Sequence, residues 1–402
     1  MNFLKFIKWF SIILIYPIVL FIIRQSQVHT YSFSFILILF IVCLSLHFVV
    51  VLIFYRIKKQ ERFHGNTSQS DQLTEKKIEL CLVAKNEGEN LIRIISHYLM
   101  FPENFRITVY DDSSDDGSFE RLLDFAADVD KRLTVKRLVR TSKTLHPKGM
   151  GVEDFIDSTE ADFIMINDAD TVVNQHDFEK AILYLEEMNY DVVHLSRRND
   201  LNQKLVTRVS DLEEMNNTAL KILGITDYCF PGSGILMTLD AARLVNYSEF
   251  VPGDDLEMGR QLKKAGKKIY HFQTVFAHEK APSRFSDFFS QRAKWSRNIA
   301  YHLFENERFG AYIQNTAAAF ALFFLFGLSS PVSLFIILTG ISYTMLSIYT
   351  NTIFAERTIL TSIIPAAVNT FQLWLQAAVF TPFYMLVYPI KRKRMDYKKS
   401  RV

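Results

Sequence analysis

Apolar residues are concentrated at the two ends of the 402-residue chain, whereas its middle mixes apolar and polar positions. The apolar runs 9–23 and 33–55 precede the mixed region, and the runs 312–328, 332–349 and 359–390 follow it. A helix needs about 20 apolar residues to cross a bilayer, so we expect two transmembrane helices before the mixed region and three or four after it. The run 9–23 is also short enough for a signal peptide, but no small-residue cleavage pattern follows it, which favours a helix.

Basic residues flank these apolar runs on one side of the predicted membrane. Lys5 and Lys8 precede the first run, the cluster 56–62 follows the second, and the cluster 391–394 follows the last. Because positively charged flanks stay on the cytoplasmic side, we expect a multi-pass integral membrane protein of the plasma membrane with a cytoplasmic middle region. The net charge of +3 is small and gives no reason to expect nucleic acid as a partner.

The middle region alternates strand-like and helix-like segments. We predict strands at 78–84, 106–110, 134–139, 163–167, 191–196, 234–239 and 268–273, and helices at 87–99, 118–127 and 176–188. This alternation is typical of an α/β fold with a mostly parallel, Rossmann-like sheet. The predicted parts are residues 1–73 with two transmembrane helices and a tether, 74–283 with the globular domain, 284–310 with amphipathic interfacial helices, and 311–402 with the remaining transmembrane helices and a basic tail.

Two carboxylates follow the predicted strand 163–167 directly. Asp168 and Asp170 lie one residue apart, just past the strand end, where open α/β sheets bind their ligands. A Mg²⁺ or Mn²⁺ ion usually keeps only one or two protein carboxylates and takes its other ligands from water and phosphate. We therefore interpret the pair as a site for Mg²⁺ or Mn²⁺, and the alternative is a simple Asx turn.

Polar side chains also follow the first two predicted strands. Asn86 and Glu87 come after the strand 78–84, and Asp112 comes after the strand 106–110. These positions share one edge of the sheet, so a nucleotide is expected there, although a helix N-cap with a turn is the alternative. Lys148 follows the third strand, where its ammonium could balance a diphosphate or simply be a solvated loop lysine.

A small-residue turn and an acidic pair occur farther along the chain. Gly232 and Ser233 belong to a turn that leaves room for a substrate close to the backbone. Asp254 and Asp255 open a predicted helix, where acidic residues either complement the helix dipole or supply a general base.

The segment 284–310 carries the last polar motif. Gln291 and Lys294 share one helical face, and Trp295 lies beside charged residues. A tryptophan in this setting either stacks on a sugar ring or anchors the helix at the membrane interface.

Taken in order between two apolar blocks, these motifs resemble the membrane-embedded family-2 glycosyltransferases, the synthases of cellulose, chitin, hyaluronan and poly-N-acetylglucosamine, whose catalytic domain has the GT-A fold. The resemblance covers most of the chain. It implies a nucleotide site at Asn86, Glu87, Asp112, Lys148 and Asp168, a metal site at Asp170 and Asp168, a catalytic base at Asp255 or Asp254, and acceptor and donor contacts from Gly232, Ser233, Gln291, Arg292, Lys294 and Trp295.

Two positions depart from the pattern of that family. The segment Gly253-Asp254-Asp255 stands where the family has Thr or Glu, then Glu, then Asp, which leaves the choice between Asp254 and Asp255 open. Lys294 stands where the family's QxxRW motif has arginine, and a lysine cannot offer a planar bidentate fork to a phosphate.

The resemblance implies an inverting, metal-dependent transferase that uses a cytoplasmic UDP-sugar to elongate a β-linked polysaccharide at the lipid bilayer, with or without an accessory subunit. One alternative is transfer of a single sugar to a lipid acceptor, similar to ceramide glucosyltransferase. Another is a non-enzymatic transporter or scaffold that binds a nucleotide. Product size would distinguish the first two.

Overall fold

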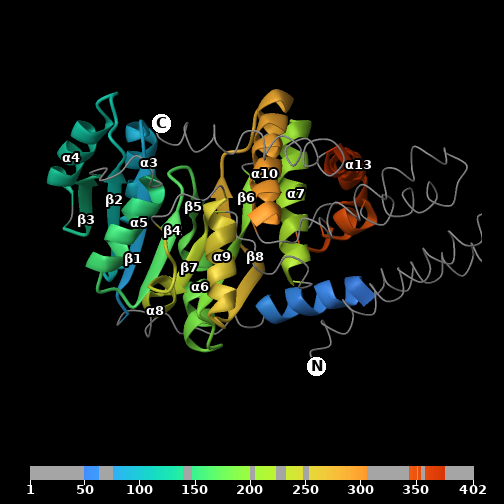
Figure 1. The fold of residues 1–402 in the computed structure, drawn as a ribbon. Coiled ribbons are helices and arrows are strands. Elements are labelled where there is room, and N and C mark those ends of the chain that lie inside the picture. Colours follow the sequence, from blue (N-terminus) through green and yellow to red (C-terminus); the bar gives the residue numbers. More distant parts are fainter. Residues whose placement is uncertain are drawn as a thin grey trace, which may run out of the picture. The chain divides into compact units, whose positions relative to one another are not determined.

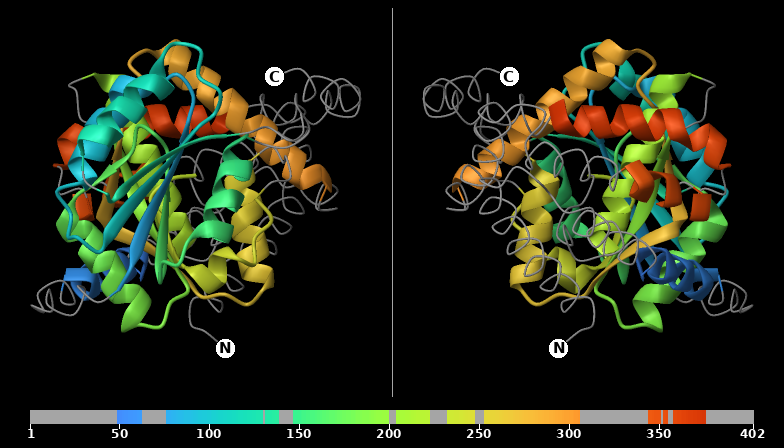
Figure 2. Two further views of the ribbon diagram at one scale, coloured as in Figure 1. Left: turned by 90° about the vertical axis from the view of Figure 1, so that its left-hand side faces the viewer. Right: turned by 90° about the vertical axis from the view of Figure 1, so that its right-hand side faces the viewer.

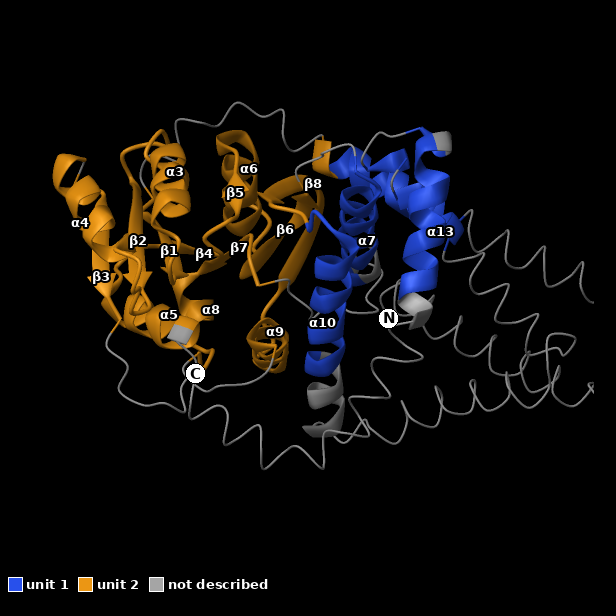
Figure 3. Ribbon diagram, turned by 90° about the horizontal axis from the view of Figure 1, so that it is seen from above, with its two compact units in different colours: residues 1–60, 202–226, 282–390 blue, residues 61–201, 227–281, 391–402 orange. Residues whose placement is uncertain are grey.

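The computed structural model describes residues 49–62, 76–129, 131–138, 147–199, 204–222, 232–247, 253–305, 344–350, 352–354 and 358–375. The chain divides into two compact units, which Figure 3 colours separately. Unit 1 comprises residues 1–60, 202–226 and 282–390, and unit 2 comprises residues 61–201, 227–281 and 391–402. Unit 2 lacks residues 202–226 and 282–283 of the globular domain predicted at 74–283, and it includes residues 61–73 and 391–402.

Unit 2 contains an eight-stranded sheet (Figure 1). Its strands are β1 (Ile78–Ala84), β2 (Phe105–Asp111), β3 (Leu133–Arg137), β4 (Phe163–Asn167), β5 (Val172–Val173), β6 (Val192–Asn199), β7 (Ile235–Thr238) and β8 (Ile269–Glu279). They lie in the order β3-β2-β1-β4-β7-β6-β8-β5. β7 and β5 run antiparallel to their neighbours and the other adjacent strands pair in parallel, so the predicted mostly parallel sheet is confirmed.

Helices cover both faces of this sheet (Figures 2 and 3). One face carries α3 (Gly88–Tyr98), α4 (Ser118–Asp128) and α6 (Gln175–Glu186), and the other carries α5 (Pro147–Ser158), α8 (Leu239–Ala242) and α9 (Asp254–Lys264). Along β4, Phe163 and Met165 pack in the α3 layer, whereas Ile164 and Ile166 pack in the α5 layer. β4 is apolar throughout because it is buried on both faces.

Among the described residues, unit 1 contains the helices α7 (Leu205–Ile222), α10 (Phe285–Glu305) and α13 (Ile359–Leu375). Residues 49–62 are also helical. α7 contacts both α10 and α13, and Val206, Val209 and Phe288 form a small apolar cluster. The interfacial segment predicted at 284–310 is thus largely the single helix α10.

The apolar runs 9–23 and 312–328 lie outside the described residues, as do most of 33–55 and 332–349 and the second half of 359–390. Within the part of the chain that the structure describes, no helix has both the length and the apolar character needed to cross a membrane.

Gly234, the residue just before β7, lies very close to residues of β6 and β8. Its φ is +68°, and a Cβ at this position would lie 2.8 Å from Ala277 Cβ and 3.4 Å from Leu195 Cβ. We expect Gly234→Ala to lower the free energy of unfolding by roughly 2–5 kcal/mol, because left-handed backbone and overpacking both destabilise an alanine here. Gly266→Ala is the matched control: its φ is +76° but nothing lies within 4 Å, so only the backbone cost applies. If denaturant titrations gave the same loss in free energy of unfolding for Gly234→Ala and Gly266→Ala, the packing argument would be contradicted.

Candidate active site

The predicted polar residues of unit 2 gather at one edge of the sheet. β1 lies between β2 and β4, and the chain passes from β1 to β2 and β3 on one side before returning to β4 on the other. The parallel strands β1, β2 and β4 end at Ala84, Asp111 and Asn167. A crevice at such a reversal of strand order is where open α/β sheets bind ligands.

The side chains of β4 alternate between the two faces of the sheet, and this alternation continues to the next residue. Asn167 and Asp168 are therefore directed to opposite faces. Asn167 is directed to the α3 layer, where its Nδ2 donates to the Tyr98 hydroxyl at 2.9 Å. Asp168 is directed to the α5 layer, where Lys148 Nζ donates to its Oδ1 at 2.5 Å. Lys148 also donates to the Gly232 carbonyl at 3.1 Å. Lys148 lies in the first turn of α5, not in the loop that the sequence predicts, so its backbone position is fixed.

The carboxylates of Asp255 and Asp168 face one point beside Gly232. A Cβ on Gly232 would lie 3.6 Å from Asp255 Oδ2 and 3.8 Å from Asp168 Oδ2, and the φ of Gly232 is +73°. Asp255 lies in the first turn of α9, and its Oδ1 accepts a hydrogen bond from the Leu256 N–H at 2.9 Å. Glycine at 232 therefore leaves space between two carboxylates that come from different elements.

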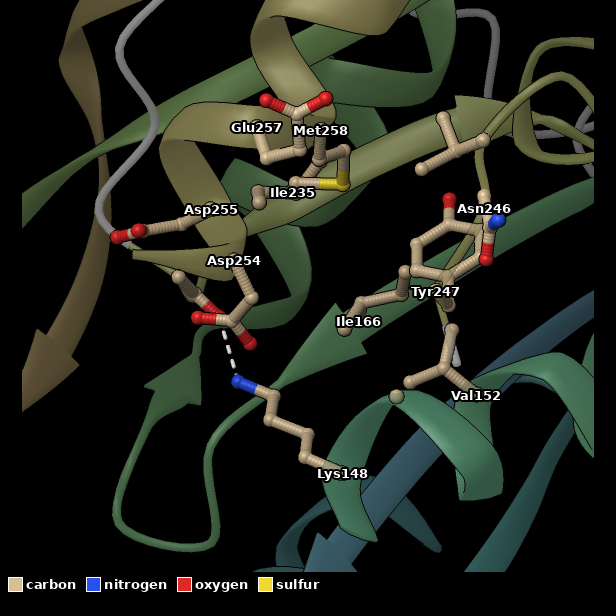
Figure 4. A pocket seen from close by; sticks show the side chains of 13 residues that line it. Lys148, Val152, Ile166, Ile235, Asn246, Tyr247, Asp254, Asp255, Glu257 and Met258 are labelled. Carbon is tan, nitrogen blue, oxygen red and sulfur yellow. Dashed lines mark hydrogen bonds between the residues drawn. The ribbon is translucent and has the colours of Figure 1, made fainter. Parts of the chain in front are cut away.

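A small cavity adjoins this point, with a volume of about 40 Å³. Its charged lining consists of Lys148, Asp254, Asp255 and Glu257, and Tyr247 and Met258 belong to its less polar part (Figure 4). In Figure 4 the Asp254 side chain points toward Lys148. Ser233, which the sequence also singles out, is buried next to Gly232.

Burial and the neighbouring charges raise the pKa of both Asp255 and Lys148. Burial and the charge of Asp254 raise the pKa of Asp255 to about 6, although the Leu256 N–H, Lys148 and Arg197 act in the opposite direction. Burial disfavours the charged form of Lys148, but the carboxylates of Asp168, Asp254 and Asp255 outweigh it and raise the lysine pKa. At neutral pH the site thus holds a fixed cation beside a carboxylate of increased basicity.

Asp170 is solvent-exposed at the rim of the same edge. Partial desolvation and the charge of Asp168 raise the pKa of Asp170, and Arg197 lowers it. No cluster of three or more His, Cys, Asp or Glu side chains that could hold a metal occurs within the described ranges. Two neighbouring carboxylates that repel each other suit a Mg²⁺ or Mn²⁺ ion that completes its shell with water and phosphate.

Arg197 was not singled out from the sequence, yet it influences both carboxylates. It lies near the end of β6, is 8% exposed, and forms an ion pair with Glu279 of β8. Its charge partly opposes the rise in the pKa of both Asp170 and Asp255, whose main cause is burial. β6 begins with two valines but ends in the polar run 196–199, so no local signal distinguished Arg197 from its neighbours.

The residues predicted to bind a nucleotide occupy the same edge but differ in their contacts. Asn86 has a φ of 59°, its Nδ2 donates to Asp115 Oδ1 at 2.8 Å, and its Oδ1 accepts from the Asp115 N–H at 3.1 Å. The Asn86 amide therefore joins the β1–α3 and β2–α4 loops. Asp112 is buried and its N–H donates to the Ala84 carbonyl at 2.8 Å. Glu87 lines a polar cleft of about 570 Å³.

The predicted motif at 291–295 lies on α10 in unit 1. Arg292 is completely buried, and its guanidinium donates to Glu213 Oε2 at 2.8 Å, to Ser210 at 3.3 Å and to Gln291. The same guanidinium lies 4.4 Å from the centroid of the Trp295 ring. Lys294 is exposed. These contacts of Arg292 and Trp295 with described residues are internal to unit 1, and the proposed role of this motif in substrate binding stays a prediction.

Breaking the buried pair between Arg292 and Glu213 should destabilise unit 1. Arg292→Met leaves the Glu213 carboxylate buried without this partner, a change that typically costs roughly 3–5 kcal/mol. The double variant Arg292→Met/Glu213→Gln removes both charges and should recover part of the loss. Thermal unfolding of the single and double variants measures this coupling, and strictly additive losses would contradict it.

Two family models match the chain. The model described as glycosyl transferase family group 2 matches residues 163–387, more than half of the 402 residues, and the model described as glycosyl transferase family 2 matches residues 79–241. A search of curated proteins finds no match.

Among solved structures, a mannosyltransferase from Pyrobaculum calidifontis in complex with GDP-Man and Mn²⁺ is 14% identical, with 87% of this chain and 96% of that chain covered and a TM-score of 0.49. A glucosyl-3-phosphoglycerate synthase from Mycobacterium tuberculosis in complex with Mn²⁺ and UDP-glucose is 17% identical, with 58% and 81% covered and a TM-score of 0.41. The assignment depends on the family models, not on these distant likenesses. The chain belongs to glycosyl transferase family group 2 and is a glycosyltransferase.

Proposed function

We propose that the protein transfers a sugar from a UDP-sugar to an acceptor hydroxyl with inversion, and that Asp255 is the catalytic base. The observation that carries this proposal is the pair of carboxylates, Asp255 and Asp168, on either side of the space beside Gly232. A base must lie within reach of the attacking hydroxyl, and a leaving diphosphate needs positive charge on the other side. Asp255 supplies the base, and Lys148, which is bonded to Asp168, supplies the positive charge.

Asp255 is the better base of the acidic pair for two reasons. Its carboxylate faces the space beside Gly232, whereas the Asp254 side chain points toward Lys148. Its pKa is raised to about 6, which brings its basicity closer to neutral pH. The acceptor hydroxyl proton passes to Asp255 as the oxygen attacks the anomeric carbon, so an α-linked donor gives a β-linked product without a covalent enzyme intermediate.

Asp170 and Asp168 are the residues that would hold a divalent cation. A Mg²⁺ or Mn²⁺ ion there would neutralise charge on the departing diphosphate. Lys148 Nζ, held between Asp168 and the Gly232 carbonyl, supplies a second positive charge that does not depend on the metal. Asp112 and Glu87 are proposed to contact the nucleoside.

We further propose that the acceptor is a growing β-linked polysaccharide of the exopolysaccharide or capsule type, and that the chain is a multi-pass plasma-membrane protein with unit 2 in the cytoplasm. The apolar runs at both ends and their basic flanks support this proposal. The match to residues 163–387 supports it as well, because it continues from unit 2 through the runs 312–328 and 332–349.

A donor screen with product sizing tests the proposal. The full chain, purified alone in lipid nanodiscs with Mn²⁺, is supplied with radiolabelled UDP-glucose, UDP-N-acetylglucosamine, UDP-glucuronate or GDP-mannose. A polymer formed from one UDP-sugar is the expected result, and it would also show that no accessory subunit is required. A lipid-soluble monoglycoside would favour single-sugar transfer to a lipid. Transfer from GDP-mannose alone would overturn the assignment of the donor.

Transfer should depend on pH through Asp255. Because the carboxylate form is the base, kcat/KM should be constant above the raised pKa of about 6 and fall by about tenfold per pH unit below it. Circular dichroism at each pH serves as the control for unfolding. A profile that stays flat down to the usual aspartate pKa of 3.8 would exclude a base with this raised pKa.

A further inference from the structure

A buried hydrogen-bond network lies directly behind the Asp168–Asp170 turn, on the α3 side of the sheet. The Gly234 N–H donates to Asn167 Oδ1 at 2.7 Å, and Asn167 Nδ2 donates to the Tyr98 hydroxyl at 2.9 Å. The same hydroxyl accepts the Val173 N–H at 3.0 Å. Asn167 is 1% exposed and Tyr98 is 0% exposed. Through these two side chains, the segment after β4 is joined to the turn that carries Gly232.

The core of unit 2 holds both the Tyr98 side of this network and the Asn167–Gly234 side in place. The Tyr98 ring packs against Phe101 and Phe105, with ring centroids 5.2 Å and 5.7 Å away. Asn167 is the last residue of β4, and the Gly234 carbonyl accepts the Leu195 N–H of β6 at 2.8 Å. Because both supports belong to the rigid core, the Tyr98 hydroxyl and the Asn167 amide have little freedom to move.

α3 makes two further contacts with the same segment. Asn90 Nδ2 donates to the Ala169 carbonyl at 2.7 Å, and the His97 Nε2 donates to the Val173 carbonyl at 2.8 Å. Ala169 stands between the two aspartates, so Asn90 bonds the backbone at the centre of the predicted metal site. α3 thus contacts the start, middle and end of the segment 167–173.

We propose that Tyr98 and Asn167 are positioning residues, which fix the Asp168–Asp170 turn relative to the Gly232 turn so that metal and base face the same donor. This inference rests on the proposed function. Neither side chain is directed to the face that carries Asp255, so neither touches the substrate. Removing a group that holds a metal ligand in place typically changes metal affinity or activity by roughly 10- to 100-fold.

Tyr98→Phe tests the proposal because it removes one oxygen atom and keeps the ring in the aromatic cluster. The matched control is Tyr184→Phe, since Tyr184 is a tyrosine of the same core layer, lies on α6 and is 1% exposed. The readout is the dissociation constant of Mn²⁺ in the presence of UDP, followed by electron paramagnetic resonance on the full chain. The melting temperature of each variant is measured alongside.

We expect Tyr98→Phe to weaken Mn²⁺ binding roughly 10- to 100-fold, while Tyr184→Phe leaves it unchanged at a similar melting temperature. Equal Mn²⁺ affinity in the two variants would overturn the proposal. If Tyr98→Phe does not fold, Asn90→Ala gives the test at a half-buried position, with Ser96→Ala on the exposed face of α3 as its control. A several-fold loss confined to Asn90→Ala would support the role of α3, and no loss would contradict it.

Mn²⁺ binding is read without turnover, so the two proposals fail in different ways. If the wild-type chain transfers no sugar in the donor screen but Tyr98→Phe still loses Mn²⁺ affinity, the proposed function fails and the network stands. If the wild-type chain transfers sugar and the two tyrosine variants bind Mn²⁺ alike, only the network fails. A wild-type chain that binds no Mn²⁺ in the presence of UDP would overturn both.

Discussion

Asp255→Asn is expected to lower kcat by roughly 10²- to 10⁴-fold, the range that removal of a general base typically produces. The amide keeps the shape of the side chain and can still accept the Leu256 N–H, but it cannot take the proton of the acceptor hydroxyl. Binding of the donor should be nearly unaffected, because Asp255 is not among the residues assigned to nucleotide or metal. Single-turnover rates with bound UDP-sugar therefore measure the effect directly.

The same substitution should make the protein more stable at neutral pH. The pKa of Asp255 is higher in the folded state than its usual value of 3.8, so the fold favours the protonated form. The stability that this group contributes is present below that value and is lost as the pH rises through about 6. Asp255→Asn should therefore raise the melting temperature at pH 8 and have little effect at pH 4.

Asp254→Asn is the control for both measurements. Asp254 is the neighbouring carboxylate in the first turn of α9, and in Figure 4 its side chain points toward Lys148. Its removal should reduce the rate far less than removal of Asp255. The reverse order of effects would make Asp254 the base and would contradict the assignment.

The central strands could be predicted because burial on both faces leaves a clear pattern. β1 and β4 span residues 78–84 and 163–167, the same residues that the sequence predicts. β4 is apolar up to Asn167, and β1 is apolar except for Glu79. Each is followed by polar residues, which indicate the edge where the site lies. The positions of Asp168 and Asp170 therefore followed from local pattern alone.

Two of the longer helices, α5 and α7, were not predicted, and their packing explains why. α5 has a short apolar stripe of Val152, Phe155 and Ile156, but Gly149 and Gly151 in its first half weaken the helical signal of the sequence. Gly151 is required for packing, because a Cβ there would lie only 2.8 Å from Val83 Cγ2 of β1. The available signal was Pro147 at the first helical position. α7 buries polar side chains such as Asp211 and Asn216, so its sequence lacks the apolar period of a surface helix.

The partners of the site residues required the fold. The sequence identified Asn86 and Arg292 as polar residues in the right motifs, but it gave no indication that Asp115 and Glu213 would bind their side chains. Likewise, nothing local distinguishes Tyr98 from other buried tyrosines, because its partner Asn167 is 69 residues away in the chain. Residue type and spacing indicate which chemistry is present, whereas long-range contacts determine which atoms remain available for it.

Asp170→Asn is expected to remove metal-dependent transfer. Metal stabilisation of developing charge is worth several kcal/mol, and about 4 kcal/mol corresponds to a rate loss of roughly 10³-fold. The loss of one carboxylate also relieves the repulsion by Asp168 that contributes to the raised pKa of Asp170, so the variant should fold at least as well as the wild type. Rates are measured across a Mn²⁺ titration after chelation with EDTA.

Wild-type protein treated with EDTA should lose activity to the same extent and recover it when Mn²⁺ is restored, whereas Asp170→Asn should not recover. Asp157→Asn is the matched control, because Asp157 is an exposed carboxylate near the far end of α5 from Lys148. It should keep the wild-type response to Mn²⁺. Full turnover in the presence of EDTA, or normal Mn²⁺ activation of Asp170→Asn, would contradict the metal assignment.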